Sequence, residues 1–159
     1  MQAVDLWLVD SLVVPASLHD VDGRFVHINA AAERASGKSD AELLGREITH
    51  LLPPETHENV RAQFRRAVED GDPTDFETTF VDAGGNLRGV RVQQLPLSDG
   101  DTIVGVVTLA FDVRRPPSEN FGLKPDPRLT LRQRQILELV ASGLSTAEVA
   151  SELTLSTET

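Results

Sequence analysis

Three helix-capping signals follow one another at short intervals near the end of the sequence. Their spacing predicts short helices. Thr130 is followed three residues later by Gln133, and Ser145 by Glu148, which is the pattern of a capping box at a helix N-terminus. Ser156 offers a third N-cap. Two short helices and the start of a third, joined by tight turns, are the layout of a helix-turn-helix DNA reader. We therefore expect a small, incomplete all-α segment at this end of the chain.

This run, residues 129–159 (LTLRQRQILELVASGLSTAEVASELTLSTET), resembles the DNA-binding domain of LuxR-type (GerE-type) transcriptional regulators. The resemblance implies that the helix N-termini contact DNA phosphates. The candidates for contact with the DNA backbone are Ser145, Thr146, Ser156, Thr157 and Thr159. Because the sequence ends three residues after Ser156, we expect this chain to lack most of the recognition helix. DNA would then be a partner only through the complete parent protein.

Charge divides the chain into parts. The final segment holds two Arg and four Glu, a formal charge of −2 that opposes phosphate binding. The net charge of −10 lies within residues 1–113, and we expect that part to repel nucleic acid. Residues 114–128 (RRPPSENFGLKPDPR) are rich in Pro and lack periodicity, which predicts an interdomain linker.

Composition excludes several classes of protein. No apolar run approaches the roughly 20 residues that span a bilayer, and the start of the chain is not a signal peptide, which predicts a cytoplasmic protein without a membrane partner. The absence of Cys excludes disulfides, thiolate metal sites and a flavin–cysteinyl photoadduct. We find no nucleophile–base pair, phosphate loop or metal-spaced cluster, so we expect neither an enzyme nor a metal site.

The front of the chain alternates strand and helix signals. Two strands meet at Asp22-Gly23, and Asn29 caps a helix that ends at Gly37. A cap at Ser39 or Asp40 opens a short helix, and apolar spacing predicts a longer helix at 57–69. Three further strands are predicted at 75–81, 87–95 and 102–113. The expected class is α+β, with an antiparallel sheet covered by helices on one face.

The pieces DGRFVHINAAAE, ELLGRE and FDV, in this order across residues 12–113, resemble a PAS domain. The resemblance implies a five-stranded antiparallel sheet that cups a small cavity, a sensory role and frequent dimerisation through an N-terminal helix. Residues 1–11 are a candidate for that dimerisation helix, and the alternative is a helix folded back on its own sheet. Many PAS domains end in Asp, an aliphatic residue and Thr, whereas here Asp112 and Val113 are followed by Arg114.

Some PAS sensors hold haem through a His on the long helix, so His57 is a candidate haem ligand; the alternative is a half-exposed histidine in the first helical turn. The other candidates are residues that we expect to line the cavity. They are Phe25, His27, Val60, Phe64 and Thr78, with Gln93 as a further polar position. Structural roles in the sheet explain His27, Thr78 and Gln93 equally well.

The leading hypothesis is a LuxR-family transcriptional regulator, a homodimer in which the PAS domain senses a small molecule and controls DNA binding by the tail. One alternative is a PAS module for dimerisation or protein interaction that takes no ligand. A second alternative is a haem-based PAS sensor.

Overall fold

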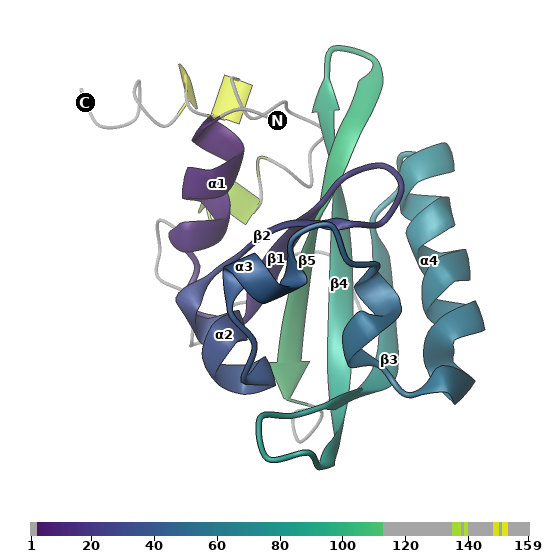
Figure 1. Ribbon diagram of the computed structural model, residues 1–159. Coiled ribbons are helices and arrows are strands. Elements are labelled where there is room, and N and C mark those ends of the chain that lie inside the picture. Colours follow the sequence, from purple (N-terminus) through teal and green to yellow (C-terminus); the bar gives the residue numbers. More distant parts are fainter. Residues whose placement is uncertain (1–2, 113–134, 138, 140–147, 150, 153–159) are drawn as a thin grey trace.

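The computed structural model of the 159-residue chain describes residues 3–112, 135–137, 139, 148–149 and 151–152. Its centre is a five-stranded antiparallel sheet with the strand order β2-β1-β5-β4-β3. The sheet confirms the α+β class and the five-stranded antiparallel arrangement expected from the sequence (Figure 1). The strands are β1 (Ala16–His19), β2 (Phe25–Ile28), β3 (Thr74–Val81), β4 (Leu87–Asp99) and β5 (Thr102–Asp112).

Helices of different lengths connect β2 to β3, the longest of them α4, and a further helix precedes the sheet (Figure 1). The predicted helix at 57–69 is present with those bounds. The α-helices are α1 (Ala3–Asp10), α2 (Ala30–Ser36), α3 (Asp40–Leu43) and α4 (His57–Glu69), and two 3-10 turns lie at η1 (Ile48–Leu51) and η2 (Pro54–Thr56).

The caps predicted in the front part of the chain are present, whereas those predicted at Thr130, Ser145 and Ser156 lie outside the described residues. The side chain of Asn29 accepts a hydrogen bond from the backbone N–H of Ala32 at the start of α2, and Gly37 ends that helix with φ of 70°, a left-handed conformation that favours glycine. Ser39, rather than Asp40, caps α3, and its capping box with Glu42 is complete.

Asn29 also ties α1 to the sheet. Its buried amide group donates to the carbonyl oxygens of Val9, Leu12 and Val14 at 3.2, 3.1 and 2.9 Å. Its Oδ1 accepts from the backbone N–H of Ala16 as well as from α2. One side chain therefore fixes the end of α1, the entry to β1 and the start of α2.

Alternating residues give the sheet two different faces. The outer face carries Leu18, Leu95, Leu97, Val107 and Leu109, all buried in one apolar cluster. Residues of α1 belong to the same cluster, so α1 folds back on its own sheet, as one of the two alternatives proposed. Leu8 and Val9 supply the buried side of α1, whereas Leu6 and Trp7 remain 37% and 45% exposed.

Three residues near the C-terminus join this outer cluster. Ile136, Leu137 and Val149 are buried with the outer face of the sheet and α1, and Leu139 packs against them. The part of the C-terminal segment that the structure describes is therefore attached to the sheet on the side of α1.

Strand β4 runs to Asp99, four residues beyond the predicted end at residue 95, and includes Pro96. Its pairing with β3 ends at the pair Thr74–Gln94, while its pairing with β5 continues. Pro96 thus lies where β4 has a neighbour on one side only, a position at which a strand tolerates proline. No helix in the described part of the chain is long and apolar enough to cross a membrane.

Candidate functional site

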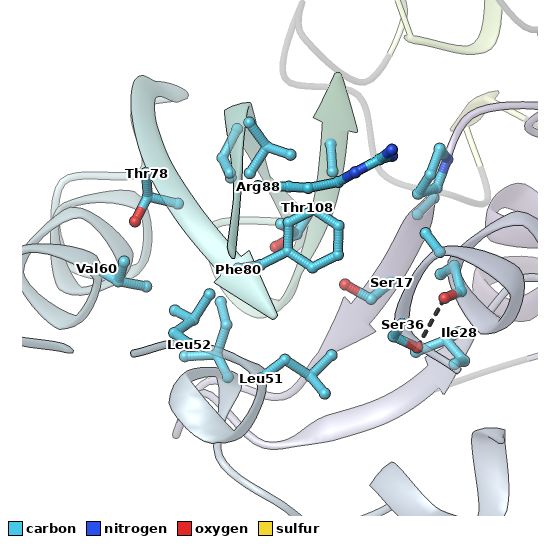
Figure 2. Close-up of a pocket in the computed structure, with 18 of the residues that line it drawn as sticks. Ser17, Ile28, Ser36, Leu51, Leu52, Val60, Thr78, Phe80, Arg88 and Thr108 are labelled. Atoms are coloured by element: carbon cyan, nitrogen blue, oxygen red, sulfur yellow. Dashed lines mark hydrogen bonds between the residues drawn. The ribbon is translucent and has the colours of Figure 1, made fainter. Parts of the chain in front are cut away.

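The inner face of the sheet and the helices that cover it line a partly open cavity of about 690 Å³. Most of its lining is apolar. Figure 2 shows lining side chains from both layers, among them Ser17 and Thr108 of the sheet and Leu51, Leu52 and Val60 of the covering segments. A largely apolar cavity of this size with few polar groups is typical of a small-molecule site.

A row of polar side chains crosses the floor of this cavity. Directly paired residues of neighbouring strands point to the same face of a sheet. The pairs Thr74–Gln94, Gln94–Thr108 and Thr108–Ser17 therefore form one continuous row across β3, β4, β5 and β1. Three members of the row, Gln94, Thr108 and Ser17, line the cavity.

Gln94 is fully buried, and only one of the two polar atoms of its side chain has a hydrogen-bond partner. Its Oε1 accepts a hydrogen bond from Thr74 Oγ1 at 2.9 Å, whereas its Nε2 has no partner. A buried donor without a partner costs about 1–3 kcal/mol, and native folds rarely leave one in place without a reason.

His19 is the second buried polar group with an unpartnered atom. Its Nδ1 lies 3.2 Å from Thr108 Oγ1, and its Nε2 has no partner. Burial without a charged partner lowers the pKa of His19 to about 3, so the ring is neutral at physiological pH. The rings of Phe25 and Phe64 pack against it, with centroids 4.5 and 5.9 Å away.

Thr78 on β3 is the third such group, because its Oγ1 is buried without a partner. At the hairpin between β3 and β4 the cavity has a charged rim. There Arg88 Nε lies 3.1 Å from Asp82 Oδ2, and the Arg88 side chain is 65% exposed. These two are the only Lys, Arg, Asp or Glu residues among the described residues that line the cavity.

The structure brings some of the predicted residues together. Phe25, Val60 and Thr78 line the cavity, as proposed. Phe64 is buried instead in a cluster with Ala67 and Val106.

His27 and Gln93 point elsewhere. The ring of His27 bonds Asp10 and Asp40, away from the cavity lining. Gln93 is next to Gln94 on β4, so it faces the opposite side of the sheet, where its Nε2 donates to Asp75 Oδ2 at 3.3 Å.

The geometry gives no support to His57 as a haem ligand. Its Nε2 lies 2.9 Å from the carbonyl oxygen of Leu52, which holds the ring against the preceding loop, and His57 is not among the residues that line the cavity. Within the described residues no three His, Asp or Glu side chains are gathered so that they could hold a metal ion. The candidates for DNA contact, Ser145, Thr146, Ser156, Thr157 and Thr159, lie outside the described residues.

Sequence reasoning missed Gln94, His19 and Thr108. A signal for Gln94 is present, because Val90 and Val92 share its parity and show that the inner face of β4 is buried. A polar residue at the next position of that face indicates a buried polar group. His19 and Thr108 come together only because β1 pairs with β5, and the sequence alone does not reveal that pairing.

Comparisons with known proteins agree with this architecture. Residues 9–116 match the family described as PAS fold, and residues 127–159 match the bacterial regulatory proteins of the luxR family. No curated protein matches the chain at a significant level.

Three solved structures illustrate the likeness in fold. The PAS domain of a protein from Colwellia psychrerythraea is 19% identical, with a TM-score of 0.60 over 69% of this chain and 94% of that one. A Rhodobacter sphaeroides LOV protein is 18% identical, with a TM-score of 0.61 over 70% and 66%. The PAS domain of the Cronobacter turicensis RpfR quorum-sensing receptor, in complex with C12:0, is 15% identical, with a TM-score of 0.56 over 63% and 93%.

Proposed function

We propose that this chain, which belongs to the PAS fold family and carries a luxR-type helix-turn-helix match behind it, senses a small molecule in its cavity and thereby controls DNA binding. The pairing of these two families supports a regulator of transcription that combines sensing with DNA binding. The luxR-type regulators are not enzymes, and we assign no catalytic residue. We place the protein in the cytoplasm, where its DNA would be.

The observation that supports the proposal is that one sheet lines the cavity with its inner face and packs against C-terminal residues with its outer face. The inner face lines the cavity through residues such as Thr108 and Ala110, while the outer face packs against Ile136, Leu137 and Val149. On β5, Thr108 and Ala110 line the cavity, and they alternate with Val107 and Leu109, which belong to the apolar cluster that the C-terminal segment joins. A ligand that shifts β5 therefore changes the surface on which that segment rests.

Control requires that the ligand bind one arrangement more tightly than another. In the proposed mechanism, an occupied cavity favours one packing of the outer face and an empty cavity favours the other. The complex of the RpfR PAS domain with C12:0 supports the view that a PAS fold can bind a small molecule.

We further propose a homodimer formed through α1. Leu6 and Trp7 are apolar and exposed on this helix, while Leu8 and Val9 hold it to the sheet. Such a dimer would present two DNA-binding segments to paired half-sites.

A cavity of about 690 Å³ favours sensing over the alternative of a PAS module without a ligand, for which a core filled by side chains is expected. The haem alternative is not favoured, because its proposed ligand His57 is not among the residues that line the cavity.

The test joins residues 1–128 to a complete luxR-type helix-turn-helix domain of known operator, with the apolar positions equivalent to 136, 137 and 149 retained. Ala110→Phe fills the cavity from β5, and Ala62→Phe places the same ring on the exposed side of α4 as a matched control. We expect Ala110→Phe to change operator affinity by about fivefold or more, the usual lower range of allosteric coupling. Equal operator affinity in the parent chimera and in both variants would contradict the proposal.

A further inference from the structure

We infer that the cavity takes an uncharged, mainly apolar small molecule whose carbonyl oxygen accepts a hydrogen bond from Gln94 Nε2. This inference rests on the proposed function and specifies the class of ligand. It comes from the unpartnered polar atoms, from the charges around them and from the apolar remainder of the lining.

The contact of Gln94 with Thr74 determines which atom of its amide is the free hydrogen-bond donor. Because its Oε1 already accepts from the hydroxyl of Thr74, the amide is oriented with its Nε2 hydrogens unpaired. The residue is fully buried and lines the cavity, so solvent does not satisfy these hydrogens. A ligand oxygen is the complementary partner.

His19 supplies a second group next to the same cross-strand row. Thr108, which pairs with Gln94, bonds His19 Nδ1 through its hydroxyl. When that hydroxyl donates to Nδ1, the single hydrogen of the neutral ring lies on Nε2, the atom without a partner. In that tautomer His19 offers a second donor, available to another acceptor atom of the ligand.

The distribution of charge argues for a neutral ligand. Among the described residues that line the cavity, the only cationic side chain is Arg88, which is at the exposed rim and paired with Asp82. His19 stays neutral because burial lowers its pKa to about 3. A carboxylate brought to Gln94 would be buried without a cation, which is strongly unfavourable.

The rest of the lining fits an apolar body. Side chains of the covering segments and of β2 and β3 surround the polar row with hydrocarbon. These are Phe25, Ile28, Leu43, Ile48, Leu51, Leu52, Val60 and Phe76. Amides, esters, lactones and ketones with an aliphatic or aromatic body are therefore the classes that match.

The test titrates the ¹⁵N-labelled chain with 2-decanone or with decanoate at pH 8 and follows the NMR spectrum. The two probes have the same number of carbons and differ in the charge at the oxygen. We expect 2-decanone to bind at least tenfold more tightly and to shift the side-chain amide resonances of Gln94. This readout does not depend on any variant.

Gln94→Met removes the donor, and Gln93→Met makes the same change on the opposite face of β4 as a matched control. We expect Gln94→Met to weaken binding of 2-decanone by about fivefold to tenfold, the effect of one hydrogen bond, and Gln93→Met to leave binding unchanged. Thermal unfolding of both variants verifies that they are folded.

Binding of decanoate as tight as that of 2-decanone, or equal binding by Gln94→Met and the parent, would overturn the inference and leave the sensory function standing. Failure of both probes to shift resonances of cavity residues would also overturn it. The proposed function would then still be decided separately, by the operator affinity of the Ala110→Phe chimera.

Discussion

His27 on β2 is joined to Asp10 at the end of α1, with 2.7 Å between Nε2 and Oδ1. The other ring nitrogen, Nδ1, lies 3.0 Å from Oδ2 of Asp40 at the start of α3. Partial burial lowers the pKa of His27, but the hydrogen bonds and charges of the two carboxylates outweigh that effect and leave the pKa raised. One imidazole thus ties the helix on the outer face to a helix above the cavity.

This bridge predicts a stability that depends on pH. Because the folded pKa of His27 is raised, the bridge contributes fully below the unfolded value of about 6.5 and is lost as pH rises through the folded pKa. Urea unfolding at pH values from 6 to 9 should show the parent losing stability relative to His27→Gln. The exposed His50 lies outside the bridge, so His50→Gln should follow the parent. A constant difference between the parent and His27→Gln would contradict this role.

His19 is expected to have the opposite effect on the free energy of unfolding, at lower pH. Its folded pKa of about 3 lies below the unfolded value, so the unfolded chain binds an extra proton as pH falls below about 6.5. The parent should lose about 2 kcal/mol more than His19→Gln in free energy of unfolding between pH 7 and pH 5. Parallel curves for the two proteins would show that His19 is not a buried neutral histidine.

Asn29 should be among the most sensitive positions in the chain. Asn29→Ala removes the cap of α2 and the donors to Val9, Leu12 and Val14, for an expected loss of about 3 kcal/mol in the free energy of unfolding. Ser39→Ala removes an exposed cap and should cost only about 1 kcal/mol. Chemical denaturation of both variants measures the difference, and similar costs would contradict the assigned role of Asn29.

Leu137 tests whether the C-terminal segment is packed on the outer face. Leu137→Ala should lower the free energy of unfolding by about 2–4 kcal/mol, because a fully buried leucine leaves a cavity. Leu44 is 62% exposed, so Leu44→Ala should change stability by less than about 0.5 kcal/mol. A loss in Leu137→Ala as small as that in Leu44→Ala would mean that the segment does not pack on the sheet in solution.

Local signals in the sequence were sufficient for much of the fold. The cap at Asn29, the helix at 57–69 and the Asp22-Gly23 turn depend on neighbouring residues, and each lies where it was predicted. The end of β4 was predicted too early. A proline usually ends a strand. Pro96 is tolerated because it lies beyond the last pair of β4 with β3, and the local sequence does not reveal where that pairing ends.

The site was predictable only in part, for the same physical reason. Phe25, Val60 and Thr78 follow from the periodicity of their own elements. The row through Gln94 and Thr108 depends on strand pairing, and a shift of one residue exchanges Gln94 for Gln93 at the cavity. The hydrogen-bond partners of His27 lie on two helices, α1 and α3, and no pattern within β2 indicates them.

Hydrogen exchange measured by mass spectrometry tests the coupling between the two faces of the sheet most directly. The comparison uses peptides that contain Ile136, Leu137 and Val149 in the parent chain, in Ala110→Phe and in the control Ala62→Phe. We predict that filling the cavity changes exchange in these peptides in Ala110→Phe and leaves it unchanged in Ala62→Phe. Identical exchange in all three proteins, with each of them folded, would contradict the claim that the cavity controls the C-terminal segment.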